Sequence, residues 1–379
     1  MAMSDVLSTR PGRGFAHVLG LTDLKNGDRA GLALWVIGLL GMALAATMLA
    51  SVAIGPIPIP VLSILPHIPG QIFDPGSPLP EGISLRDWIV VMEIRLPRIL
   101  LGALIGAALA VSGAVMQGLF RNPLADPGIV GVSAGAGLGA AFFIVLGSTT
   151  LAPVMTVLGI YAVPFAAFTG GLITTLLLYR IGTRGGFTSV ATLLLAGIAL
   201  GALAGAVTGV LVYISNDQQM RDLQFWGLGS LAGANWEKMA SVAPIILLML
   251  FATPFLARGL NGLTLGEAAA AHIGIRVQRL KNISILLVAA ATGASVAVSG
   301  GIGFVGIVVP HLLRLTIGPD HRYLLPASAL LGACLLIAAD TLARTIVAPA
   351  ELPIGIITAF VGAPFFLWIL LRNRGQMGL

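Results

Sequence analysis

Charged residues are scarce in this sequence, and their scarcity excludes a water-soluble globular protein. Only 9% of the 379 residues are Asp, Glu, Lys or Arg, whereas a typical soluble domain has roughly 25%. Hydrophobic residues make up 57%, so the chain has too little charge to cover a water-exposed surface of its size. The same charge is enough for the ends of helices whose sides face lipid.

Cysteine and lysine are nearly absent as well, which removes several kinds of site. The one cysteine, Cys334, lies in an apolar run and cannot form a disulfide within the chain or a thiolate metal cluster. None of the lysines Lys25, Lys238 and Lys281 follows a glycine, so the chain lacks a phosphate-binding loop for ATP. The histidines show no metal-ligand spacing, and no basic stretch forms a face for nucleic acid. We therefore expect no catalytic residue, cofactor or metal in this chain.

Long apolar runs recur instead, each near the roughly 20 residues that cross a bilayer as a helix. They predict an all-α, polytopic membrane protein with about ten transmembrane helices and both termini on one side. Ala110–Gly113 recurs as Ala297–Gly300 in a run of opposite direction, which predicts an inverted repeat of helices 2–5 and 7–10; chance recurrence is the alternative. The ten predicted helices are residues 31–53, 99–119, 128–147, 159–179, 189–213, 239–257, 282–299, 301–317, 324–343 and 354–371.

Polar segments between and beyond these runs give the predicted organisation. Residues 1–30 and 373–379 form tails, and residues 31–372 form the transmembrane domain. Within that domain, residues 54–92 hold eight prolines and predict an irregular outside loop, and residues 258–281 predict a polar inside segment. Under this topology 15 of the 21 Lys and Arg residues lie on the side of the N-terminus, so the positive-inside rule places both tails in the cytoplasm.

The chain shows no energy source of its own. Its main acid within an apolar run, Asp340, lies near the outer end and not at the mid-membrane position typical of ion-coupled carriers. A separate motor subunit would resolve this, and segment 258–281 can receive one. There Thr264-Leu265-Gly266-Glu267 matches a capping box, Ala268 begins a run of helix formers, and Gly274 can end the helix in a left-handed conformation. We expect a short helix off the membrane, with an idle loop helix as the alternative.

Two further patterns each have a packing interpretation and a functional one. Glycines at four-residue spacing form a stripe in the third run, which favours close helix packing, and a longer stripe in the fifth run, which predicts a subunit contact or a pore face. Three arginines break the charge rule by lying at the outer end, where they would attract an acidic partner or serve as ordinary interfacial residues. The third-run glycines are Gly131, Gly135 and Gly139; the fifth-run glycines are Gly197, Gly201, Gly205 and Gly209; the arginines are Arg95, Arg98 and Arg344.

Blocks of sequence within residues 90–371 resemble the permeases of ATP-binding-cassette (ABC) importers for iron–siderophores, haem and cobalamin, known as type II importers. The blocks are Arg95–Arg98, Ala110–Gln117, Arg121–Pro127, Gly303–Gly306, Pro310–Arg314, Asp320–Arg322, Glu351–Gly355 and Gly362–Pro364. The haem permeases are the nearest of these, chiefly around Gly318–Pro326. The first 30 residues and the proline-rich loop are not covered well by the resemblance.

The resemblance implies a transport subunit and not an enzyme. It implies a homodimer in a bacterial inner membrane that imports haem or a related iron compound. It also implies two cytoplasmic ABC subunits that use ATP and Mg, and a periplasmic substrate-binding protein. By position, Arg95, Arg98 and Arg344 would dock the binding protein, Thr264–Gly274 would be the coupling helix, and the fifth-run glycine stripe would line the pathway or the dimer contact. A siderophore or cobalamin importer is the first alternative, and an ion-coupled secondary carrier is the second.

Overall fold

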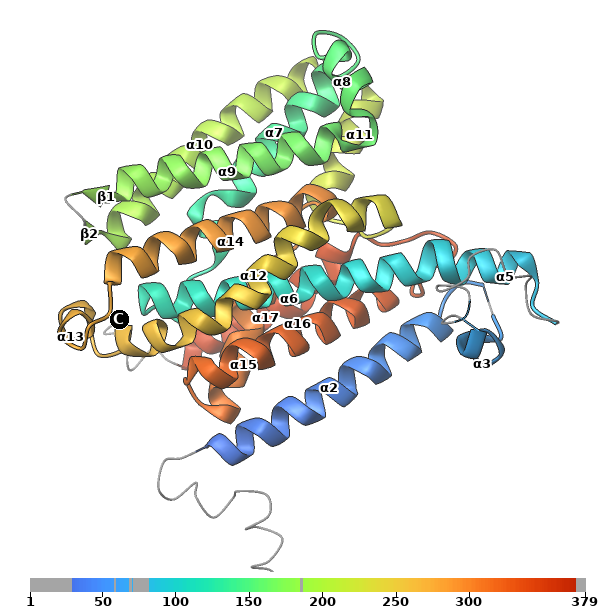
Figure 1. The fold of residues 1–379 in the computed structure, drawn as a ribbon. Helices are drawn as coiled ribbons and strands as arrows, with labels where there is room; N and C mark the ends of the chain where they lie inside the picture. Colours follow the sequence, from blue (N-terminus) through green and yellow to red (C-terminus); the bar gives the residue numbers. More distant parts are fainter. Residues whose placement is uncertain (1–28, 58, 68–69, 71–81, 185–186, 373–379) are drawn as a thin grey trace, which may run out of the picture.

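The computed structural model describes residues 29–57, 59–67, 70, 82–184 and 187–372. Nearly all of the first predicted tail, the whole of the second and part of the predicted loop 54–92 lie outside these residues. The described part is almost entirely helical, and its strands form a two-residue antiparallel hairpin between two helices (Figure 1).

Each of the ten predicted apolar runs falls on a helix. Seven helical segments of the described chain are long and apolar enough to cross a membrane, and three further apolar helices are shorter. The predicted all-α membrane fold is thus confirmed, while the number of ten crossings is matched only approximately. The long helices are α2 (Ala30–Ala53), α6 (Leu96–Phe120), α9 (Ala162–Gly182), α10 (Val190–Ile214), α12 (Trp236–Leu263), α14 (Val277–Ser299) and α16 (His321–Ala343); the shorter ones are α7 (Val132–Leu146), α15 (Val305–Ile317) and α17 (Ile354–Arg372).

Short elements extend or connect these helices. Two of them, α11 and α13, lie in the polar segments that interrupt the apolar pattern. The short elements are α3 (Val61–Ile64), η2 (Leu65–His67), α5 (Leu85–Ile89), the π-helical turn η3 (Val90–Arg95), η4 (Pro127–Val130), α8 (Ala152–Leu158), η5 (Gly159–Tyr161), β1 (Thr183–Arg184), β2 (Phe187–Thr188), α11 (Asp217–Leu228) and α13 (Glu267–His272).

The second predicted helix begins earlier than expected. α5, η3 and α6 form one helical run, Leu85–Phe120, of 36 residues, which is roughly 54 Å long and exceeds the roughly 30 Å of a bilayer core. Its first turns therefore project beyond the bundle (Figure 1). Ser84 starts the run, because its hydroxyl accepts a 3.1 Å hydrogen bond from the amide of Asp87. The prediction of an irregular loop is wrong for residues 85–92.

α6 is the helix around which the others pack. It contacts α16, α12, α14 and α15 and is buried along most of its length (Figure 1). Small residues allow this close approach: Gly113 lies against the backbone of Gly306 at the start of α15, and Gly106 and Gly332 bring α6 and α16 together backbone to backbone. α2 and α10 lie on opposite sides of the bundle and expose apolar side chains.

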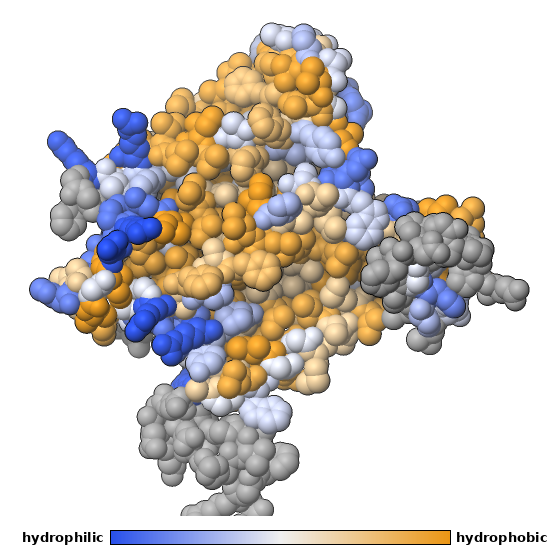
Figure 2. All heavy atoms as spheres, in the orientation of Figure 1, coloured by the Kyte–Doolittle hydropathy of each residue, from blue (hydrophilic) through white to orange (hydrophobic). Residues whose placement is uncertain are grey.

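Charged and polar residues gather at two ends of this bundle. Figure 2 shows hydrophilic residues toward the end where α13 and the β1–β2 hairpin lie and toward the end where α5 and α11 lie, with a largely apolar flank between them. We call these the α13 end and the α5 end. Polar contacts hold helix termini together at the α13 end; for example, the Arg29 side chain at the start of α2 donates to the carbonyl of Thr316 near the end of α15.

The contact between α6 and α15 predicts an intolerance of added volume. A Cβ at Gly113 would overlap the carbonyl oxygen of Gly306, which is backbone and cannot move aside cheaply. We expect Gly113→Ala to lower the free energy of unfolding by about 1–3 kcal/mol, the usual cost of overpacking. Thermal melting of the detergent-solubilised protein measures this.

Gly102→Ala is the matched control on the same helix. Its added Cβ would lie 3.2 Å from Leu231 Cδ1, the end of a flexible side chain, so we expect little change in melting temperature. Equal melting temperatures for the two variants would contradict the proposed backbone contact.

Candidate functional site

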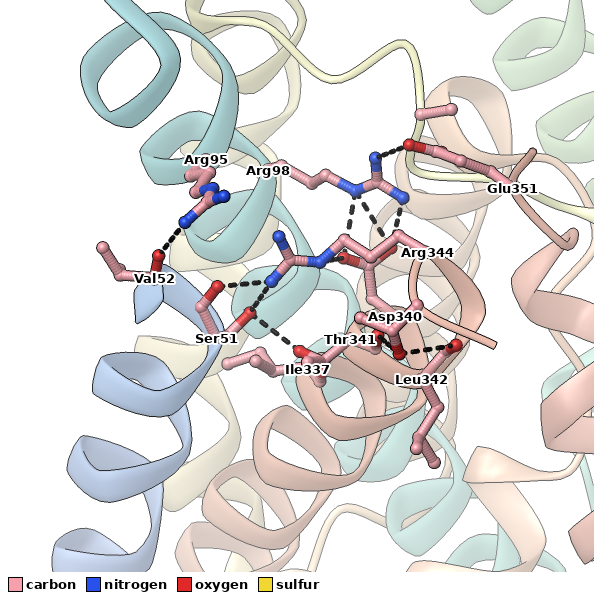
Figure 3. Close-up of polar contacts among 12 residues, drawn as sticks. Ser51, Val52, Arg95, Arg98, Ile337, Asp340, Thr341, Leu342, Arg344 and Glu351 are labelled. Atoms are coloured by element: carbon pink, nitrogen blue, oxygen red, sulfur yellow. Dashed lines mark hydrogen bonds and ion pairs between the residues drawn. The ribbon is translucent and has the colours of Figure 1, made fainter. Parts of the chain in front are cut away.

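The three arginines predicted to dock a partner lie together at the α5 end, inside the protein (Figure 3). Arg95 is 3% exposed, Arg98 is 6% exposed and Arg344 is 4% exposed. The guanidinium group of each is engaged by other groups of the same chain, so it would have to leave them to contact a second protein. Docking by these three residues stays a prediction. Their buried contacts within the chain also stabilise the fold.

Arg98 joins α6 to α16 and to the loop before α17. Its Nε and Nη2 donate to the carboxylate of Asp340 at 2.9 to 3.0 Å, and its Nη1 donates to Glu351 Oε1 at 3.0 Å (Figure 3). Asp340 is 3% exposed, so this two-nitrogen contact is a buried, charge-assisted pair. The guanidinium is therefore held by acids that stand 242 and 253 residues away in sequence.

Arg95 and Arg344 cap the C-terminal end of α2. The last carbonyls of a helix have no helical partner, and that end carries about half a negative charge. Both arginines donate to these carbonyls, and Arg344 also donates to the Ser51 hydroxyl at 2.7 Å. Gly55 leaves room for them, because a Cβ there would lie 2.6 Å from Arg95 Nη2. The accepting helix carbonyls are that of Ser51 for Arg344 and those of Val52 and Ala53 for Arg95, which also donates to the carbonyl of Ile57 beyond the helix.

The charges of this arginine cluster nearly balance. Arg98 pairs with the carboxylates of Asp340 and Glu351, and Arg344 Nε lies 3.8 Å from Asp340. The C-terminal end of α2 offsets part of the charge of Arg95 and Arg344. Burial lowers the pKa of Arg344, and the nearby Asp340 carboxylate opposes that effect. An arginine stays protonated under ordinary conditions even so. The cluster therefore fastens α2, α6, α16 and the loop before α17 to one another.

The predicted coupling segment lies at the opposite end of the bundle, around α13. The predicted capping box is wrong: α12 continues to Leu263, and the Thr264 hydroxyl donates 2.6 Å back to the carbonyl of Asn261. Gly266, at φ +103°, precedes the first residue of α13, Glu267. The predicted left-handed end at Gly274 is confirmed, since its φ is +86° and its amide bonds the carbonyl of Ala271.

α13 is attached to the bundle on one side and exposed on the other. Ala270 is fully buried, and the Glu267 carboxylate accepts a 2.8 Å bond from Lys281 Nζ on α14. Leu265 is 69% exposed and Ile273 is 63% exposed, although α13 lies at the polar end of the bundle. Ala268, which was predicted as part of this segment, is exposed as well. Exposed apolar side chains therefore stand just before and just after a helix that its buried Ala270 and the Glu267–Lys281 pair hold to the bundle.

The two glycine stripes have opposite surroundings. In α7, a Cβ at Gly135 would overlap the Gly170 carbonyl and one at Gly139 would overlap the Ala166 carbonyl, so close packing against α9 is confirmed. In α10, added Cβ atoms would meet nothing within 4 Å, so the fold itself does not need glycine there. The α10 positions with this open surrounding are Gly201, Gly205 and Gly209, and Gly197 is partly buried.

The structure assigns a role to Arg314 and contains a helix, α11, that sequence analysis did not predict. Arg314, whose role was unassigned, donates to the side chain of Gln117 on α6, and Gln117 Nε2 in turn donates 3.0 Å to the carbonyl of Gly306. α11 was not predicted, although a capping box that Asn216 and Gln219 form marks its start and was readable from the residue spacing. Both features lie at helix termini, where polar groups need partners.

The arginine cluster predicts that the stability of the fold depends more strongly on Asp340 than on Glu351. Asp340→Asn removes the negative charge between two buried arginines, and we expect it to lower the free energy of unfolding by about 3–5 kcal/mol. Glu351→Gln is the control: its side chain is 33% exposed, so the loss should stay below about 1 kcal/mol. Melting temperatures in detergent compare the two, and equal losses would show that burial does not set the contribution of each acid.

Comparison with known proteins identifies the family of this chain. The model of the FecCD transport family matches residues 42–372. The hemin transport system permease protein HmuU of Yersinia pestis is 50% identical over 289 residues, which cover 76% of this chain and 85% of that protein. The cobalamin import system permease protein BtuC of Halobacterium salinarum is 41% identical over 362 residues, which cover 88% and 95%.

A solved structure agrees with the sequence relatives. It is described as an inward-facing conformation of a metal-chelate type ABC transporter, and it superimposes with a TM-score of 0.74 at 32% sequence identity. The match covers 89% of this chain and 99% of that chain. The earlier resemblance to importer permeases is thereby confirmed, and the chain belongs to the FecCD transport family.

Proposed function

We propose that this chain is the membrane-spanning permease of an ABC importer that carries haem, or a related iron compound, into the cytoplasm. The observation that carries the proposal is the 50% identity to a hemin permease over 76% of the chain. The cobalamin permease at 41% identity keeps cobalamin as the alternative cargo, and a siderophore complex is a further one. The chain is a transport subunit that changes no bond in its cargo.

The α13 end is the cytoplasmic end in this proposal, with the N- and C-terminal tails on the same side of a bacterial inner membrane. Two ABC subunits bind there and hydrolyse ATP with Mg. The exposed Leu265 and Ile273, which flank α13, would enter an apolar groove of the ATPase, as exposed large apolar side chains do at interaction surfaces. The ATPase would then move the permease because its two nucleotide states bind this surface differently.

The α5 end is the periplasmic end, where a substrate-binding protein delivers the cargo. The arginine cluster would support the docking surface from beneath, by fixing the helix ends that form it. A second copy of the permease would cover the open glycine stripe of α10, because glycines with nothing opposite them leave room for a close helix partner. Cargo would pass between the two copies.

Reconstitution tests the function and the cargo together. We expect the permease, co-assembled with its ABC subunits in proteoliposomes, to take up haem only when ATP and the haem-loaded binding protein are both supplied. Uptake of haem should exceed uptake of cobalamin or of a ferric siderophore, each offered with the same binding protein, by at least tenfold.

The permease reconstituted without its ATPase is the control for the energy source. Concentrative haem uptake by that preparation on a proton or sodium gradient would contradict an ABC permease and favour a secondary carrier. ATP-dependent uptake of cobalamin in place of haem would keep the mechanism and correct the cargo.

The exposed residues of the coupling segment predict a loss of ATPase binding without a loss of folding. We expect Ile273→Glu to reduce co-purification of the ABC subunit by at least tenfold, since a charge cannot enter an apolar groove without cost. Ile346→Glu is the control, because Ile346 is 62% exposed but lies beyond the other end of α16. Equal co-purification by both variants would place the ATPase contact elsewhere.

A further inference from the structure

A polar contact ties the last turn of α12, just before the coupling residues Thr264–Gly274, to the start of α16. Asn261 lies in the last turn of α12, and its side chain uses both of its polar atoms on the N-terminus of α16. Its Nδ2 donates 2.6 Å to Asp320 Oδ1, and its Oδ1 accepts from the backbone amide of His321 at 2.9 Å and lies 2.8 Å from His321 Nδ1. Since an amide oxygen only accepts, His321 Nδ1 carries the proton.

This contact, which we call the Asn261 knot, is partly buried and closely fitted. The His321 side chain is 2% exposed, and its ring lies against α6, where a Cβ at Gly118 would overlap Nε2. Asp320 is also the N-cap residue of α16, because its carboxylate accepts a 2.9 Å hydrogen bond from the amide of Arg322. A shift of the end of α12 must therefore move the first turn of α16 or break the hydrogen bonds that Asn261 makes to Asp320 and His321.

Asn261 is joined equally closely to the coupling segment. Its backbone carbonyl accepts from both the hydroxyl and the amide of Thr264, at 2.6 and 3.2 Å. The Asn261 side chain thus holds α16 while its backbone holds the turn that leads into α13. Among the described residues from Asn261 to Gly266, the side chain that is hydrogen-bonded to another transmembrane helix is that of Asn261.

α16 runs from this knot to the arginine cluster at the other end. His321 is its first residue, and Asp340, which binds Arg98, lies 19 residues later, roughly 28 Å along a helix axis. The helix is packed against α6 and α2 over this length. One end of α16 is therefore hydrogen-bonded beside the coupling segment, and the other is ion-paired where α2, α6 and the loop before α17 meet.

We propose that Asn261 is a positioning residue for transport, through which the movement of the coupling segment reaches α16 and, along it, the α5 end. The inference rests on the proposed function, since it assumes that an ATPase moves α13. It adds the route of that movement within the permease: α13 to α12, α12 to α16 through the Asn261 knot, and α16 to the arginine cluster.

A side-chain exchange tests the inference. Asn261→Asp places a carboxylate against Asp320, and the two should repel each other. Adding Asp320→Asn restores a donor to that carboxylate and still caps α16. In the full complex with haem as cargo, we expect Asn261→Asp to lower the number of haem molecules carried per ATP hydrolysed by at least fivefold, and the double variant to return it to within twofold of the unsubstituted protein.

Asn282→Asp is the matched control. It makes the same chemical change near the start of α14, where the Asn282 side chain accepts its hydrogen bonds from Tyr179 on α9 and Gln278 on α14 within the described part of the chain. We expect its haem-to-ATP ratio to stay within twofold of the unsubstituted value. A purely structural role for Asn261 would lower the yield of complex and leave the ratio of the assembled complex unchanged.

The outcomes separate the two proposals. An unchanged ratio in Asn261→Asp, or a lowered ratio that the double variant does not restore, would overturn the role of the knot and leave the importer function intact. If the complex with Asn261→Asp does not assemble, Gly118→Ala is the substitute test, because the added Cβ displaces the His321 ring without altering a polar group. A haem-to-ATP ratio equal to that of the unsubstituted complex would then overturn the inference. Absence of ATP-dependent uptake by the unsubstituted complex would contradict the proposed function and this inference with it.

Discussion

A charge or a backbone group that is withdrawn from water must find a partner inside the protein, and this requirement shapes both ends of the bundle. At the α5 end, Arg98 is fixed by Asp340 and Glu351, while Arg95 and Arg344 satisfy the carbonyls that α2 leaves free at its end. At the α13 end, Asn261 does the same for the first amide of α16. Helices that carry almost no charge along their sides are thus held in register by the few polar residues at their termini.

The apolar runs were sufficient to predict the helices, because a segment near 20 residues without charge has few other stable forms. Helix ends were harder to predict. Thr264 and Glu267 have the spacing of a capping box, yet α12 takes Thr264 into its own C-terminal turn and leaves Glu267 to bind Lys281. Gly274 was predictable because a left-handed backbone depends on the residue itself, whereas the start of α13 depends on where the preceding helix stops.

The arginines show a second limit of sequence patterns. Arg95, Arg98 and Arg344 were expected at the outer end, and they lie at the α5 end, but their exposure depends on partners far away in the chain. The glycine stripes show the same limit. Four-residue spacing describes α7 and α10 equally, and only the position of α9 makes the first stripe a packing surface within this chain. Spacing identifies a face of a helix, while tertiary packing decides what lies opposite.

An importer that hydrolyses ATP at one membrane surface must open and close at the other, so its permease needs parts that transmit movement without absorbing it. A helix does this well along its axis when both of its ends are fastened and its sides are closely packed. α16 meets these conditions: its first turn is bonded to α12, its last turn is paired with Arg98, and Gly332 lets its backbone touch that of α6. α10 is mostly exposed and has open glycines facing away from the fold, so within one copy of the chain it is the less suited of the two to carry such a movement.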